Sequence, residues 1–158
     1  MLLYYENLQT SELNDNILSA EQEAKHMNKL RTGNRDRILI VDDDHDILVT
    51  FKAALEENNE FEVDTFTDPD EVLSNFKAGL YNLLIIDIRL PKMDGFELYD
   101  KIKEIDNKAK VCFVSAYEIN YKALRTIFPS PDIDECFIRK PVNMKDFVGR
   151  VKSELTPE

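Results

Sequence analysis

Polar residues able to do chemistry follow short apolar runs at four places: Asp42 with Asp43, Asp87, Ser115 and Lys140. An apolar run that stops at a polar residue is typical of a buried strand leaving its sheet. The carboxyl ends of parallel strands meet at one edge of an open α/β sheet, which would bring these side chains together. A carboxylate, an ammonium and a hydroxyl around one point suit phosphoryl transfer, because the latter two stabilise phosphate oxygens. The arrangement predicts that Asp87 accepts a phosphoryl group as an aspartyl phosphate.

The clustered carboxylates also predict a metal ion. Two carboxylates about 4 Å apart repel by about 4 kcal/mol at an effective dielectric constant of about 20, so the cluster needs a cation. Oxygen ligands without His or Cys favour Mg²⁺. Taken singly, such residues are more often loop caps, solvated charges or turn formers, so the interpretation rests on their joint occurrence. We interpret the neighbours His45, Asp44, Asp46 and Asp94 as helix or loop residues.

The elements that must position these residues alternate regularly between about residues 38 and 155. The predicted strands cover residues 38–41, 61–66, 83–86, 111–114 and 136–138, and the predicted helices cover about 47–55, 69–79, 96–105, 119–128 and 144–155. Alternation with short connections predicts a parallel sheet covered by helices on both faces, with right-handed crossovers. Gly79 is expected to end the second helix, and Ile105 to be buried on the third. In the loop after Asp87, Pro91 fixes φ and Gly95 is expected to tolerate a positive φ.

Composition narrows the class of protein. The 158 residues are 43% hydrophobic and carry a net charge of −11, which argues against a nucleic-acid-binding surface. No apolar run approaches the roughly 20 residues of a membrane-spanning helix, and the start of the chain lacks a signal-peptide pattern. Cys112 and Cys136 lie in apolar runs without zinc or disulfide spacing. We expect buried, reduced thiols in a cytoplasmic protein.

Residues 1–36 differ from the rest and are expected to form an N-terminal extension that is partly helical or disordered. A weak apolar stripe at three- and four-residue steps predicts a partly helical segment. The stripe consists of Leu13, Ile17, Ala20, Ala24 and Met27. A solvated leader and a dimerising or partner-binding helix both fit it. Residues 37–158 are expected to be a single domain, with no further domain after the last helix.

The region from Ile38 to Leu155 resembles a receiver domain of a two-component response regulator. The resemblance rests on Asp42-Asp43, on Asp87-x-x-Leu90-Pro91-x-Met93-Asp94-Gly95, on Ser115-Ala116 and on Lys140-Pro141. It implies a flavodoxin-like, doubly wound five-stranded sheet of order 2-1-3-4-5. It also implies a donor, a histidine kinase or phosphotransfer protein, that phosphorylates Asp87.

The resemblance implies roles for individual residues. Asp43, Asp87 and the carbonyl of Arg89 would hold Mg²⁺, with Asp42 acting mainly through water. Ser115 and Lys140 would bind phosphate oxygens, and the Lys140–Pro141 bond would be cis.

Two further positions have expected roles beside the site. Phe137 occupies the place of the family's rotating aromatic switch, which would act together with Ser115. Arg89 and Tyr117 lie beside the path by which water attacks the phosphoryl group, so they are expected to tune its lifetime.

These features predict a stand-alone receiver, which is a phosphorylation-dependent switch rather than an enzyme. Its expected partners are the phosphodonor and a downstream protein target, without nucleic acid or membrane, and a homodimer is left open. The rival interpretations are a Mg²⁺-dependent phosphohydrolase with Asp87 as nucleophile and a constitutive adaptor insensitive to phosphate. The stretch 129–135 is longer and more acidic than the corresponding stretch of receiver domains. This difference leaves the mode of target docking open.

Overall fold

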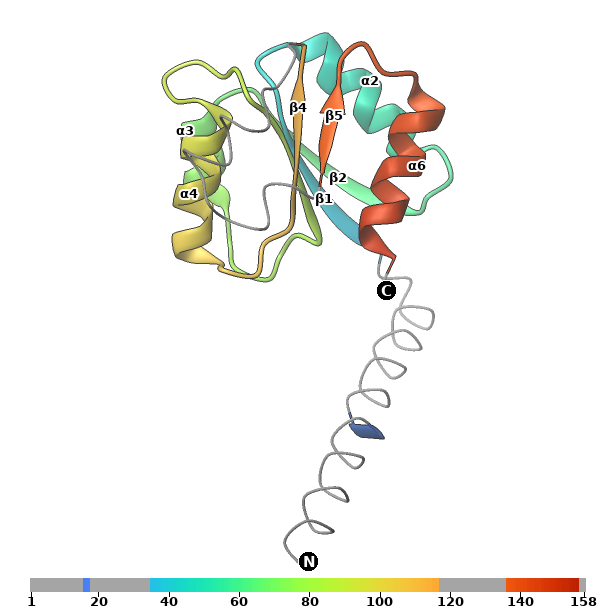
Figure 1. Cartoon of the computed structure of the whole chain (residues 1–158), viewed down its shortest axis with the longest axis horizontal. Coiled ribbons are helices and arrows are strands. Elements are labelled where there is room, and N and C mark those ends of the chain that lie inside the picture. Colours follow the sequence, from blue (N-terminus) through green and yellow to red (C-terminus); the bar gives the residue numbers. More distant parts are fainter. Residues whose placement is uncertain (1–15, 18–34, 117–135, 157–158) are drawn as a thin grey trace, which may run out of the picture. The chain divides into compact units, whose positions relative to one another are not determined.

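Figure 1 shows a computed structural model of the chain, in which residues 16–17, 35–116 and 136–156 are described. The chain divides into two units, Met1–Arg35 and Asp36–Glu158. Residues 16–17 are helical, and the rest of the predicted N-terminal helix lies outside the described residues. The predicted helix 119–128, Tyr117 and the unusual stretch 129–135 lie outside them as well.

The second unit is built on a parallel sheet of order β2-β1-β3-β4-β5. Its strands are β1 (Asp36–Val41), β2 (Phe61–Phe66), β3 (Leu83–Asp87), β4 (Val111–Ser115) and β5 (Phe137–Arg139). Every neighbouring pair is parallel, and the aliphatic residues of β1 and β3 are buried on both faces. The observed strand order confirms the predicted flavodoxin-like sheet. The strands are continuous aliphatic runs because both faces of the sheet are covered.

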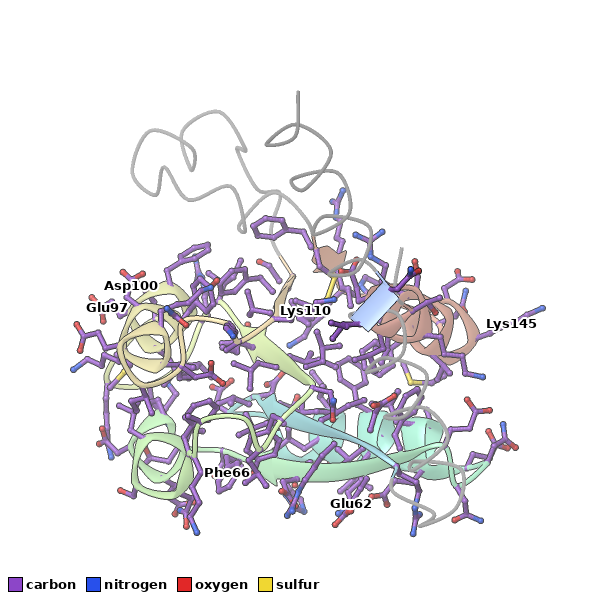
Figure 2. All side chains as sticks on the ribbon, turned by 90° about the horizontal axis from the view of Figure 1, so that it is seen from below. Glu62, Phe66, Glu97, Asp100, Lys110 and Lys145 are labelled. Atoms are coloured by element: carbon purple, nitrogen blue, oxygen red, sulfur yellow. A yellow bond between two sulfur atoms is a disulfide. The ribbon has the colours of Figure 1, made fainter. Side chains whose placement is uncertain are left out.

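Helices cover both faces of this sheet (Figures 1 and 2). One face packs against α2 (His45–Glu56) and α6 (Met144–Leu155), where Phe51 and Phe147 stack with ring centroids 4.1 Å apart. The other face packs against α3 (Pro69–Asn75) and α4 (Gly95–Ile105). Among the described residues, no helix has both the length and the apolar character needed to cross a membrane.

Side-chain caps explain where the helices begin. Asp44 precedes α2 and accepts hydrogen bonds from the amides of Asp46 and Ile47, so His45 opens that helix as expected. Asp68 caps α3, with Pro69 at its first position, and Asp94 caps α4 through the amide of Glu97. Short oxygen-bearing side chains at these positions satisfy backbone donors that the first helical turn leaves unpaired.

Two details of the helices differ from the prediction. The second helix, α3, ends at Asn75 rather than at Gly79, because Phe76 takes an extended conformation and its ring packs against that of Tyr81. Gly79 has a φ of +76° in the turn that follows. Ile105 is 46% exposed, since it is the last residue of α4 and burial on that helix stops one turn earlier, at Ile102.

The prediction that the two cysteines are reduced thiols is also wrong, because Cys112 and Cys136 form a disulfide bond. Cys112 lies in β4, and Cys136 immediately precedes β5. The strand register aligns Phe113 with Phe137, so the two cysteines are neighbours across adjacent strands, with Cα atoms 4.6 Å apart. Their separation of 24 residues in sequence gave no sign of this proximity.

Candidate functional site

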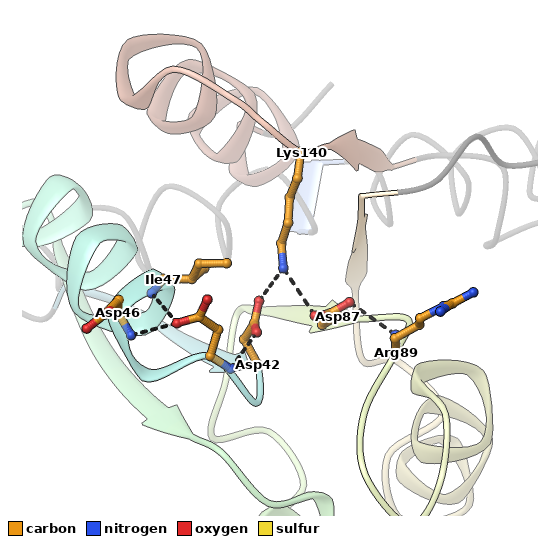
Figure 3. Close-up of polar contacts among 7 residues, drawn as sticks. Asp42, Asp46, Ile47, Asp87, Arg89 and Lys140 are labelled. Carbon is orange, nitrogen blue, oxygen red and sulfur yellow. Dashed lines mark hydrogen bonds and ion pairs between the residues drawn. The ribbon is translucent and has the colours of Figure 1, made fainter.

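Four strand ends deliver polar side chains to one edge of the sheet, and Figure 3 shows three of these side chains, those of Asp42, Asp87 and Lys140. Asp42 follows β1, Asp87 ends β3, Ser115 ends β4, and Lys140 follows β5. The Lys140 ammonium donates to Oδ2 of Asp42 at 2.6 Å and to Oδ2 of Asp87 at 3.1 Å. The Lys140 amide donates to the Ser115 carbonyl at 2.8 Å, which fixes these two residues beside each other. The predicted side chains therefore lie together in the structure, although Asp42 and Lys140 are 98 positions apart in the sequence.

Three carboxylates make up the acidic part of the site. Oxygen atoms of Asp42, Asp43 and Asp87 lie within 4.8 Å of one another. Asp42 and Asp87 are buried, with 2% and 8% of their surface exposed, whereas Asp43 is exposed. Backbone amides bind the remaining oxygens of the buried pair: that of Asp44 donates to Asp42 and that of Arg89 to Asp87. This donor set fits Mg²⁺, which takes one or two carboxylates and keeps several waters on an open side.

Burial and charge shift the proton affinities of the site. Burial raises the pKa of Asp42, and hydrogen bonds from Lys140 and the Asp44 amide offset only part of that rise. Burial alone would lower the pKa of Lys140, but its hydrogen bonds to Asp42 and Asp87 and their charges outweigh burial and leave the pKa raised. Lys140 therefore keeps its positive charge at neutral pH and neutralises part of the acidic cluster.

The loop after Asp87 is shaped by close packing rather than by the positive φ expected at Gly95. A Cβ atom at Gly95 would overlap the backbone carbonyl oxygen of Asp87 and lie 3.0 Å from Ile88 Cα. The Gly95 amide also donates to the carbonyl of Ile88 at 2.8 Å. Only glycine permits this approach of the start of α4 to the end of β3.

Sequence reasoning missed a second feature of this loop, at Lys92. This residue has a φ of 70°. Its ammonium lies 2.7 Å from Asp68 and 3.1 Å from Asp70, at the start of α3. A lysine in a turn between predicted elements gave no sign of either partner. The contacts tie the loop that follows Asp87 to a neighbouring helix.

The other predicted site residues differ in burial and in orientation. Ser115 is buried, with 4% of its surface exposed. Phe137 is half-buried, and its ring stacks on that of Phe113 with centroids 5.6 Å apart. The guanidinium of Arg89 points away from Asp87 in Figure 3, although its backbone amide binds that residue. The Lys140–Pro141 bond is cis, as the resemblance implied.

A pocket of about 550 Å³ adjoins the site and was not predicted from the sequence. Its walls are largely apolar, formed by α2 on one side and by the segment after β5 on the other. They include Ile47, Phe51, Val142 and Met144, and Lys140 reaches its rim from the acidic cluster.

Together, the doubly wound sheet and the acidic cluster with its lysine define a receiver-type α/β domain. The family model of the response regulator receiver domain matches residues 38–152, so the chain belongs to this family. Receiver domains are modules of two-component signalling, and the resemblance inferred from the motifs is confirmed.

Individual relatives support this assignment. Regulatory protein VanRB of Enterococcus faecalis is 33% identical over 119 residues, which are 75% of this chain and 52% of that protein. Response regulator receiver protein CpdR of Brucella abortus is 29% identical over 121 residues, which are 75% of this chain and 96% of CpdR. The first curated relatives are matched over about half of their length, 49% and 52%.

A solved structure shows a similar fold. The crystal structure of response regulator protein TrrA from Thermotoga maritima, in complex with Mg(2+)-BeF, is 32% identical, with a TM-score of 0.63. The alignment covers 76% of this chain and 99% of that chain.

Proposed function

We propose that the protein is a phosphorylation-dependent signalling switch in which Asp87 accepts a phosphoryl group from a histidine kinase or phosphotransfer protein. The observation that carries the proposal is the pairing of the buried Asp87 carboxylate with the Lys140 ammonium, 3.1 Å away, inside a cluster of further carboxylates. A structural ion pair would not need the additional acids, because each added carboxylate raises the electrostatic cost of the cluster.

In this proposal each side chain of the site has its own task. A carboxylate oxygen of Asp87 attacks the phosphorus of the donor's phosphoryl group, and the bond between phosphorus and the donor breaks with its electron pair left on the donor. The Lys140 ammonium neutralises charge on the oxygens of the group in transfer. Ser115, at the adjacent strand end, offers its hydroxyl to a phosphate oxygen. Asp42, Asp43 and Asp87, with the carbonyl of Arg89, would hold Mg²⁺, which neutralises negative charge on the phosphoryl oxygens.

We propose that Ser115 and Phe137 convert phosphorylation into a change of surface. A hydrogen bond to a charged phosphoryl oxygen contributes about 1.5–3 kcal/mol, enough to shift a two-state equilibrium by roughly 10- to 150-fold. Ser115 would move toward the phosphate, and Phe137 would follow into the space it leaves. Phe137 is suited to this because it is only half-buried and stacks on Phe113 at the edge of the sheet.

Arg89 and Tyr117 would then tune how long the phosphoryl group survives. Neither side chain is a good base for activating water at neutral pH, and both are large enough to obstruct its approach. The guanidinium of Arg89 points away from Asp87 here, so shielding requires it to turn toward the site. Faster loss of phosphate in Arg89→Asn and in Tyr117→Ala would support the shield, and unchanged decay in the double variant would refute it.

The apolar pocket beside Lys140 supports a protein as donor. A protein that seats an apolar side chain between α2 and the segment after β5 would bring its phosphorylated residue to the open side of the acidic cluster. We further propose a cytoplasmic protein that acts on a downstream protein target. Response regulator receiver protein CpdR, which this chain matches over 96% of CpdR's length, is one relative in which the receiver makes up nearly the whole match.

The phosphohydrolase and the phosphate-insensitive adaptor remain as rivals, and two measurements separate them from the proposed switch. Incubation with Mg²⁺ and a small acyl phosphate should add one phosphoryl mass to wild type and to Asp100→Asn, an exposed control, but none to Asp87→Asn. An adaptor would gain no phosphoryl group at all. A phosphohydrolase would release phosphate over many turnovers from other phosphate esters.

A further inference from the structure

We propose that Cys112 and Cys136 form a redox site that exchanges with small-molecule thiols and disulfides and controls the reactivity of Asp87. The control rests on the function proposed above, whereas the exchange itself does not. The two cysteines are bonded across neighbouring strands and are buried, with 0% and 1% of their surface exposed.

A cation lies beside one of the sulfur atoms and favours exchange, and the carboxylate within 4.8 Å of both sulfur atoms, that of Glu154, is paired with this cation. The Arg150 guanidinium donates from Nε to Sγ of Cys136 at 3.5 Å, and its other end pairs with Glu154 at 3.4 Å. A cation beside a sulfur stabilises the thiolate, which is the nucleophile and leaving group in thiol–disulfide exchange. The Arg150 side chain is 44% exposed, so this one side chain spans the distance from Cys136 to solvent. We expect displacement of this side chain to give a small thiol or disulfide access to the bond.

The disulfide joins β4 to the residue before β5, and both strands end at residues of the proposed phosphorylation site. Ser115 is three residues after Cys112 on β4, and Lys140 is four residues after Cys136 at the end of β5. In the described part of the sheet, β5 is an edge strand of three residues that pairs with β4 alone. Without the disulfide, these two strands are joined only by non-covalent contacts, namely backbone hydrogen bonds and side-chain packing such as the stacking of Phe137 on Phe113, so we expect Lys140 to be held less firmly beside Asp87.

The exchange takes place in two steps, in which the atoms and electrons balance. The Cys136 thiolate attacks a small-molecule disulfide, forms a mixed disulfide and expels one thiolate. The Cys112 thiolate then attacks Sγ of Cys136, closes the protein disulfide and expels the second thiolate. The protein pair loses two electrons and two protons, and the small disulfide gains both to become two thiols.

Glutathione buffers of varied oxidised-to-reduced ratio test the proposal on the full chain. Alkylation followed by intact mass should show both thiols modified at the reducing end and neither at the oxidising end. The initial rate of phosphorylation by acetyl phosphate with Mg²⁺ should be about threefold or more higher in the oxidised form, because Lys140 is then better positioned. In Cys112→Ala/Cys136→Ala, the phosphorylation rate should not depend on the ratio of oxidised to reduced glutathione. If the double variant folds poorly, Cys136→Ala serves in its place. Arg150→Gln should slow disulfide closure several-fold relative to Lys145→Gln, an exposed control.

Two results would overturn the proposal. If both cysteines are alkylated at every ratio, or at none, the pair does not exchange. If the pair responds but oxidised and reduced protein are phosphorylated equally fast, it does not control Asp87. Failure of both forms to take a phosphoryl group would instead refute the proposed function, and alkylation would still decide whether the redox site exists.

Discussion

Lys140→Met is the substitution with the sharpest consequence, because it removes the cation between two buried carboxylates. The Lys140 side chain is 15% exposed, and its ammonium contacts both Asp42 and Asp87. We expect the variant to fold but to be less stable without Mg²⁺, and to gain more stability from Mg²⁺ than wild type does. The second effect follows because the ammonium occupies the carboxylate oxygens that a metal ion would use.

The size of the effect follows from the geometry. An ion pair at about 3 Å contributes about 5 kcal/mol of attraction at an effective dielectric constant of about 20, and burial of the ammonium offsets part of this. Removing one partner of a buried ion pair typically costs about 3–5 kcal/mol. Partial exposure and proton uptake by the remaining carboxylates reduce the cost, so we expect a loss of about 3 kcal/mol.

Urea unfolding with EDTA and again with Mg²⁺, for wild type, Lys140→Met and the exposed control Lys145→Met, measures both effects. Mg²⁺ should raise the free energy of unfolding of Lys140→Met by at least about 1 kcal/mol more than that of wild type. Equal stability of Lys140→Met and wild type in EDTA would refute the ion-pair argument. An equal gain from Mg²⁺ in both would show that the metal does not use these oxygens.

Three other outcomes are expected. Reducing the disulfide should lower the free energy of unfolding by about 3.5 kcal/mol, from the entropy of a loop of about 25 residues, as measured by urea unfolding with and without reductant. Gly95→Ala should cost about 2–3 kcal/mol and slow phosphorylation, because its Cβ meets the carbonyl of Asp87. Gly149→Ala, with nothing within 4 Å of an added Cβ, should gain up to about 1 kcal/mol, and equal effects of the two would contradict the close-packing argument. Burial and a hydrogen bond to Asp64 raise the pKa of Tyr81 to about 12. This phenol therefore contributes stability below pH 10 that is lost between about pH 10 and 12, so wild type should lose more stability than Tyr81→Phe over that range.

Most of the fold and the acidic cluster could be predicted because their signals are local. Each strand is a short aliphatic run, and a polar residue marks where it ends, as Asp87 does for β3. Cap residues such as Asp44 and Asp94 act on amides two or three positions away, so the sequence shows both partners. Parallel pairing then brings the strand ends together without further information.

The features that were missed depend on which residues lie opposite each other in space. The disulfide required the register of β4 against β5, and the role of Gly95 required the approach of α4 to the end of β3. The partners of Lys92 belong to a helix 22 and 24 residues earlier in the chain. Neither residue type nor spacing fixes such neighbours.

The central claim is that the phosphoryl group is carried by the carboxylate of Asp87, and peptide mapping tests it most directly. Tryptic cleavage after Lys77 and Arg89 yields a peptide in which Asp87 is the only acidic residue. After phosphorylation with acetyl phosphate and Mg²⁺, this peptide should carry the phosphoryl group and lose it to hydroxylamine, as an acyl phosphate does. A phosphoryl group on another peptide, or one that resists hydroxylamine, would contradict the account.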